Sequence, residues 1–194
     1  MKVNRLIDTL ALGGVSLVLL IAFYFQLVVG ELPCSLCNLQ RAGFMLFGSG
    51  LLLNVWRSEP SRVNYALSAV GALIGSWIGL MQMFLHVLPG TPAYGDAIFG
   101  MHMYTATYVV LTAGVIYCVL MLAFQQQLQT ISVGAPQKGN RRPMLVRIIA
   151  GLFAALVIGN FVSVVLETGT HKLYSDPKHY LQRRSGKGIN ERVA

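Results

Sequence analysis

The chain has 194 residues, of which 55% are hydrophobic and only 11% are charged, and its formal net charge is +8. Soluble domains carry about 25% charged residues, so this composition excludes an ordinary soluble core and indicates a protein folded in a lipid bilayer. The positive charge does not indicate nucleic-acid binding, because the lysines and arginines lie at the ends of apolar segments and in the tail, where they anchor and orient spans.

Five apolar stretches follow one another along the chain, at about 10–30, 42–56, 63–88, 104–124 and 148–166. A transmembrane helix needs about 20 apolar residues, and the second stretch reaches that length only if 37–41 form its first turn. Backbone groups in lipid must be paired within the segment, so each stretch predicts a helix. The expected fold is an all-α polytopic membrane bundle, with a four-helix core and an added fifth helix.

This pattern divides the chain into four parts. We expect a four-helix membrane domain over 1–124, an inner connecting loop over 125–147, a further transmembrane helix over 148–166 and a basic tail over 167–194.

In the third stretch Gly71, Gly75 and Gly79 recur every fourth residue, which predicts a ridge for close helix packing.

The distribution of lysine and arginine predicts the orientation of the spans, since cations concentrate on the inner side. The loop over 88–103 has no cation, whereas the opposite connections carry Lys2, Arg5, Arg57, Arg62, Lys138, Arg141, Arg142 and Arg147. Cys34 and Cys37 therefore belong to an outer turn, in a compartment where disulfides persist. A fifth crossing places the tail outside as well, against the charge rule, which is weaker for late segments.

Cys34-Ser-Leu-Cys37 is a C-x-x-C pair at the expected start of the second span. A helix start and a nearby cation lower a thiol pKa, and Arg41 lies one turn beyond Cys37. A structural zinc site needs four ligands, and the sequence has no second pair. A structural disulfide closing so short a loop gains little stability. The pattern favours redox chemistry, and the remaining Cys118 lies mid-span, where cysteine is usually inert packing.

The run Cys34-Ser-Leu-Cys37-Asn-Leu-Gln-Arg41 resembles the C-x-L-C-x-x-x-R motif of the disulfide bond formation protein B (DsbB) family. That family consists of membrane oxidases that pass electrons from a periplasmic thiol oxidase to a quinone. The resemblance implies that Cys34 and Cys37 are catalytic and that Arg41 lies by the quinone. Phe25-Gln26 is similar to the family's first helix, and His86 falls where the family places a residue near the quinone, so both join the expected cofactor site.

The same resemblance implies a bacterial inner membrane, with the cysteine pair facing the periplasm. It also implies ubiquinone or menaquinone as cofactor and a periplasmic thioredoxin-like (DsbA-type) partner. Two features depart from the family. The loop over 88–103 lacks the second cysteine pair that reacts with the partner, and a fifth span follows the usual four.

Two other classes of function stay open at this stage. One is a non-enzymatic membrane scaffold or quinone-binding subunit with a structural disulfide. The other is copper handling by the cysteine pair together with Met101-His102-Met103, because thioethers and imidazole suit Cu(I).

Overall fold

The computed structural model describes residues 3–30, 34–57, 60–86, 97–98, 100–133 and 143–168. Its elements, in chain order, are α1 (Val3–Tyr24) with the π-helical turn η1 (Phe25–Val29), α2 (Ser35–Trp56), α3 (Arg62–His86), β1 (Ala97–Ile98), β2 (Met101–His102), α4 (Met103–Val133) and α5 (Met144–Thr168). The two short strands form one antiparallel pair. The expected all-α bundle is confirmed, and the expected tail lies outside the described residues beyond Thr168.

Four described segments are long and apolar enough to cross a membrane: Asn4–Val29, Arg62–His86, Met103–Phe124 and Met144–Leu166. They correspond to the first, third, fourth and fifth stretches expected from the sequence. The chain is therefore a multi-pass membrane protein.

Helix α2 is not one of these four, although its 22 residues span about 33 Å at 1.5 Å per residue. It begins at Ser35, so 37–41 do form its first turns and lengthen the expected second span. Its position explains its more polar composition, because α2 contacts all four other helices and buries Gln40 and Asn54 among them. Protein, rather than lipid, surrounds much of this helix.

Several helix boundaries differ from the apolar stretches. Helix α1 begins at Val3 and α5 at Met144, both earlier than expected, and α4 continues beyond Phe124 to Val133, into the segment expected as a connecting loop. Hydropathy ends at Phe124, but the glutamine-rich sequence after it favours helix and contains no glycine or proline before Gly134. Helix propensity, rather than apolarity, therefore sets the end of α4.

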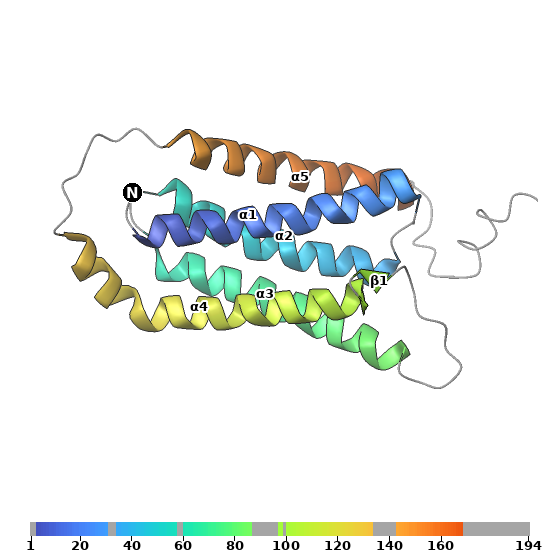
Figure 1. The fold of residues 1–194 in the computed structure, drawn as a ribbon, viewed down its shortest axis with the longest axis horizontal. Helices are drawn as coiled ribbons and strands as arrows, with labels where there is room; N and C mark the ends of the chain where they lie inside the picture. The colour runs from blue at the N-terminus through green and yellow to red at the C-terminus, as the bar shows by residue number, and fades with distance from the viewer. Residues whose placement is uncertain are drawn as a thin grey trace, which may run out of the picture.

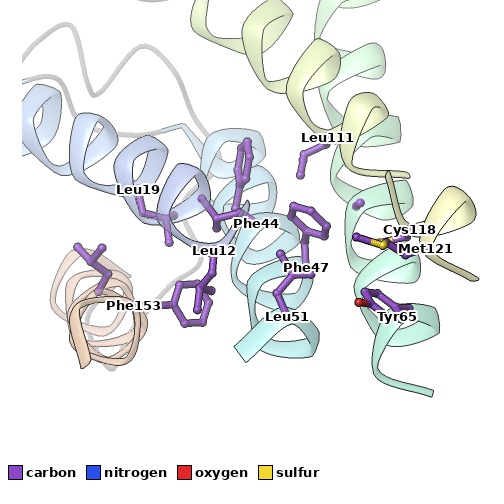
Figure 2. Packing of buried hydrophobic residues seen from close by; sticks show 13 residues of the cluster. Leu12, Leu19, Phe44, Phe47, Leu51, Tyr65, Leu111, Cys118, Met121 and Phe153 are labelled. Atoms are coloured by element: carbon purple, nitrogen blue, oxygen red, sulfur yellow. The ribbon is translucent and has the colours of Figure 1, made fainter. Parts of the chain in front are cut away.

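The helices run alternately up and down, with α2 in the middle, α5 beside α1, and α4 beside α3 (Figure 1). Phe44 and Phe47 of α2 lie between the two sides of the core (Figure 2). On one side they meet Leu12 of α1 and Phe153 of α5, and on the other the buried Cys118 of α4. Cys118 is thus part of the packed core, as expected.

Glycines allow α2 and α3 to approach closely. A Cβ added to Gly43 would lie 2.6 Å from Gly75 Cα, and one added to Gly71 would lie 2.6 Å from the Phe47 nitrogen. A Cβ on Gly79 would lie 3.2 Å from the Tyr104 oxygen, so this glycine faces α4. The expected packing ridge is confirmed: Gly71 and Gly75 lie against α2, and Gly79 lies against α4.

The cysteine pair and several arginines lie at opposite ends of the bundle. Arg5 Nη2 donates to the Arg57 carbonyl oxygen over 2.9 Å, which ties the start of α1 to the end of α2. Arg62 and Arg147 begin α3 and α5 at this same end (Figure 1). The start of α2, with Cys34 and Cys37, lies at the other end.

Candidate functional site

Cys34 is the N-cap residue of α2. Its backbone is extended (φ −70°, ψ 165°), and its Sγ accepts a hydrogen bond from the Cys37 backbone N–H over 3.2 Å. The two Sγ atoms lie 2.7 Å apart. Since a disulfide bond is about 2.05 Å long, a small side-chain movement suffices to close or open it.

The surroundings of Cys34 favour its thiolate. The Cys37 thiol donates to it and, with backbone N–H groups of Cys37 and Leu36 and the Gln82 amide, lowers the pKa of Cys34 to about 7, while burial opposes this shift. The sequence suggested that the helix dipole acts on Cys37. In the structure the N-cap acceptor is Cys34, whose Sγ accepts from the Cys37 backbone N–H, so the helix start favours a thiolate at Cys34.

Two glutamines complete the surroundings of the sulfur atoms. Gln82 Nε2, on α3, lies 3.7 Å from Cys34 Sγ and 3.8 Å from Cys37 Sγ, within hydrogen-bonding range for sulfur. Gln82 Oε1 accepts from Gln40 Nε2 of α2 over 2.7 Å. Both side chains are buried. Neither was selected from the sequence, where the one signal was a glutamine inside an apolar span, four residues before His86.

Arg41 is bound to α1. Its Nη1 donates to Gln26 Oε1 over 2.5 Å, its Nη2 donates to the Ala22 carbonyl over 3.0 Å, and its guanidinium lies 5.8 Å from the centre of the Phe23 ring. Gln26 sits in the π-helical turn η1, a rare form often found at functional sites. Gln26 Nε2 donates to Ser163 Oγ of α5 over 2.5 Å, so this chain of bonds joins three helices.

His86 is linked to the cysteine pair through Gln82. Its Nδ1 lies 2.8 Å from the Gln82 carbonyl oxygen, which only accepts, so Nδ1 carries the proton. Its ring stacks on Tyr104, and the ring of His102 also stacks on Tyr104, each at 5.3 Å between centroids. Among the described residues, the buried atoms His102 Nδ1 and Asn38 Oδ1 have no hydrogen-bond partner.

The structure thus brings the expected site residues into two groups. Cys34 and Cys37 touch each other, with His86 joined to them through Gln82. Arg41 and Gln26 form the second group, with Ser163 as a member that the sequence did not reveal. Within the part of the chain that the structure describes, no group of three or more His, Cys, Asp or Glu side chains is arranged to hold a metal ion.

Comparison with known proteins supports the resemblance seen in the motif. The family model of disulfide bond formation protein DsbB matches residues 4–97, which include α1, α2 and α3. Curated proteins named "Disulfide bond formation protein B" are similar to this chain over 71 to 87 residues. The one from Marinobacter nauticus is 39% identical over 87 residues, covering 41% of this chain and 51% of the relative.

The relative from Chromobacterium violaceum is 37% identical over 71 residues, covering 35% of this chain and 43% of the relative. The relative from Herminiimonas arsenicoxydans is 32% identical over 74 residues, covering 38% and 47%. The chain spans about half the length of the curated relatives it matches, and no solved structure matches it.

The family match covers the elements that build the site. It contains the cysteine pair, the arginine one turn beyond it and the glutamine of η1, whereas α4 and α5 lie outside it. Over residues 4–97, this chain is similar to the disulfide bond formation protein B family.

Proposed function

We propose that this chain is a membrane thiol–disulfide oxidoreductase of the bacterial inner membrane, which passes electrons from a periplasmic thiol partner through Cys34 and Cys37 to a quinone. The observation that carries the proposal is the cysteine pair at the start of α2, in which Cys34 Sγ accepts from the Cys37 backbone N–H and lies 2.7 Å from Cys37 Sγ. An inert structural pair has no need of a stabilised thiolate, whereas thiol–disulfide exchange proceeds through one.

The exchange half of the reaction follows from this geometry. A thiolate of a thioredoxin-like partner attacks Cys34 Sγ of the Cys34–Cys37 disulfide, forming a mixed disulfide and releasing the Cys37 sulfur as thiolate or thiol. The partner's second thiolate then attacks its own bridged sulfur and releases Cys34. The partner loses two electrons and two protons, and the pair gains them. The N–H groups at the start of α2 and the Gln82 amide stabilise the released Cys34 thiolate.

The residues at this end of the bundle fit a quinone, which would supply the two-electron, two-proton acceptor that re-forms the disulfide. Arg41 and Gln26 would hold a quinone oxygen by charge-assisted hydrogen bonding, and His86 presents a flat ring whose Nδ1 is already fixed. The buried Asn38 Oδ1, without a partner among the described residues, can accept from a hydroxyl group. Exposed apolar side chains nearby, such as Leu39 and Leu85, suit a lipid-soluble tail.

A trapping experiment tests the exchange half. In a Cys37→Ala variant, Cys34 has no intramolecular partner to resolve a mixed disulfide, so a reducible covalent adduct with a periplasmic protein is expected. The adduct should disappear in the Cys34→Ala/Cys37→Ala variant, which retains Cys118 as an internal control. If an abundant, folded Cys37→Ala protein forms no adduct, the chain is a scaffold or quinone-binding subunit instead.

The electron-acceptor half is tested separately. Purified wild-type protein, given a reduced dithiol, should reduce added ubiquinone or menaquinone, and the Cys34→Ala variant should not. Equal rates in the two proteins would remove the cysteine pair from the reaction.

A further inference from the structure

We infer that the buried amide pair Gln40–Gln82 belongs to the thiol chemistry, with Gln82 as the donor that stabilises whichever sulfur is anionic and Gln40 as the residue that fixes its direction. The inference rests on the proposed exchange at Cys34 and Cys37, and it adds to that exchange two side chains from outside the cysteine motif.

The direction of the Gln82 amide follows from its partners. Gln40 Nε2 donates to Gln82 over 2.7 Å, so the atom facing Gln40 must be the amide oxygen. The amide NH₂ then faces the sulfur atoms, at 3.7 Å and 3.8 Å. Had the amide been reversed, its oxygen would face Cys34, and a thiolate there would be repelled.

The near-equal distances to the two sulfurs suit an exchange reaction. An amide NH₂ has two N–H groups and can serve both acceptors without moving. As the negative charge passes between Cys34 and Cys37, the same donor remains in contact with it. Gln82 and Gln40 are 1% and 5% exposed, so water competes little and the local dielectric is low, which strengthens the bond to an anion.

The position of Gln82 is set by the packing of α3 against α2 and by a bond within α3. The glycine crossing of α2 and α3 holds the two helices together, and the Gln82 carbonyl is bonded to His86 one turn further on. Gln40 lies three residues after Cys37 on α2, so both ends of the pair are held by the elements that carry the reacting atoms.

The pH profile of Cys34 reports on this arrangement. The titratable side chains at this end of the described structure include Tyr24 of α1, Cys37 and Arg41 of α2, His86 of α3, His102 of β2, and Tyr104 and Tyr108 of α4. Of these, Cys37 is hydrogen-bonded to Cys34, while Arg41 is bonded to α1 and His86 to the Gln82 carbonyl.

The test is the alkylation rate of Cys34 against pH in the reduced, full-length protein, followed by mass spectrometry of the Cys34 peptide. Gln82→Met keeps the length of the side chain but removes the donor. It should move the midpoint of the alkylation profile to higher pH and lower the thiolate fraction at pH 6 by about tenfold, the lower end of the effect of losing one hydrogen bond to a charged group. Gln82→Glu replaces the donor with a carboxylate that cannot donate to sulfur. It should raise the pH midpoint of Cys34 alkylation further than Gln82→Met does.

Gln40→Glu tests the positioning role. A carboxylate at 40 only accepts, so the Gln82 NH₂ should turn toward it and present the amide oxygen to Cys34, raising the midpoint although Gln82 is unchanged. The added negative charge of the carboxylate would by itself also raise the midpoint of Cys34 alkylation. In a Gln82→Met background, Gln40→Glu should therefore have little further effect if it acts through the amide, and its full effect if it acts by charge.

A matched control separates this role from general damage to α3. Ser76→Ala removes another hydrogen bond of α3, the part-buried one to Thr112 of α4, and should leave the Cys34 midpoint unchanged. An unchanged midpoint in folded Gln82→Met and Gln82→Glu would overturn the inference. Alkylation needs neither partner nor quinone, so this outcome is independent of the proposed function, whose failure would appear in the trapping and quinone-reduction assays.

Discussion

At the scale of single residues, the cysteine pair is asymmetric. Both cysteines lie at one helix start, yet only the Cys34 side chain is the N-cap acceptor, receiving a hydrogen bond from the Cys37 backbone N–H. In the proposed exchange this asymmetry favours the second step, in which Cys34 leaves the mixed disulfide as a thiolate stabilised by the helix-start N–H. Cys37 lies one turn before Arg41.

The first prediction concerns the pH dependence of Cys34 in the reduced protein. Because its pKa is lowered to about 7 from 9.0, its alkylation rate should rise as pH increases through about 7 and then level off. The stability that the thiolate gives the reduced fold is fully present above pH 9.0 and is lost as pH falls through about 7.

The Cys37→Ala variant is the companion measurement. It removes the largest cause of the lowered pKa, the hydrogen bond from the Cys37 thiol, so the alkylation midpoint should move upward toward 9.0. A midpoint that stays near 7 would show that the backbone and Gln82 alone stabilise the thiolate.

The second prediction concerns Arg41. Arg41→Ala should weaken quinone turnover far more than folding, because a lost charge-assisted hydrogen bond costs roughly 1.5–3 kcal/mol, or about tenfold to a hundredfold in kcat/KM for quinone. Arg62→Ala, which removes an exposed arginine at the opposite end, is the matched control. Equal kinetic constants for Arg41→Ala and wild type would remove Arg41 from the site.

At the scale of elements, the crossing of α2 and α3 decides whether the site forms. Gly43 and Gly75 meet where no side chain fits, and the same contact holds Gln82 at the sulfur atoms. Helix α2 is too polar to be ranked with the apolar spans, and it is stable in the centre because its polar side chains find partners on its neighbours.

The third prediction tests this crossing. Gly43→Ala places a Cβ 2.6 Å from Gly75 Cα and should destabilise the protein by about 1–3 kcal/mol, seen as a lower Tm in detergent. Gly14→Ala is the control, because nothing lies within 4 Å of its added Cβ. Equal Tm values for the two variants would mean that the helices are not in close contact at Gly43.

The fourth prediction concerns helix α5, which lies outside the family match but contacts Gln26. Ser163→Ala removes the acceptor that orients the Gln26 amide, so Arg41 should be held less firmly and the KM for quinone should rise by a fewfold, about the effect of one neutral hydrogen bond. Ser49→Ala, whose hydroxyl bonds only within its own helix in the described structure, serves as control. An unchanged KM would leave α5 as an added span without a role in the site.

At the scale of the whole molecule, the alternating helices separate the cysteine end from the arginine end. The fifth prediction is that α2 crosses the membrane together with the four apolar spans, and five crossings would put the two ends of the chain on opposite sides. A reporter active only outside the inner membrane should be active when fused after Ala194, and inactive when inserted at 58–59. Activity at both places or at neither would contradict five crossings with α2 among them.

The sequence by itself determined the class of the protein, most of its spans and the place of its cysteine pair. These are local properties: hydropathy over about 20 residues selects a membrane helix, and four consecutive residues define a C-x-x-C at a helix start. The glycine ridge of α3 was likewise visible, because packing glycines recur at helical spacing on one face. Where local hydropathy and helix propensity diverge, as after Phe124, the boundaries expected from apolarity were wrong.

Only the tertiary structure decided which sulfur is the acceptor and which side chains surround it. Gln82 and Cys34 lie on different helices, as do Ser163 and Gln26, and nothing in their local sequence indicates that they meet. The central position of α2 was also decided there, because a polar helix is placed by the partners available to its side chains, and those partners come from every other helix of the bundle.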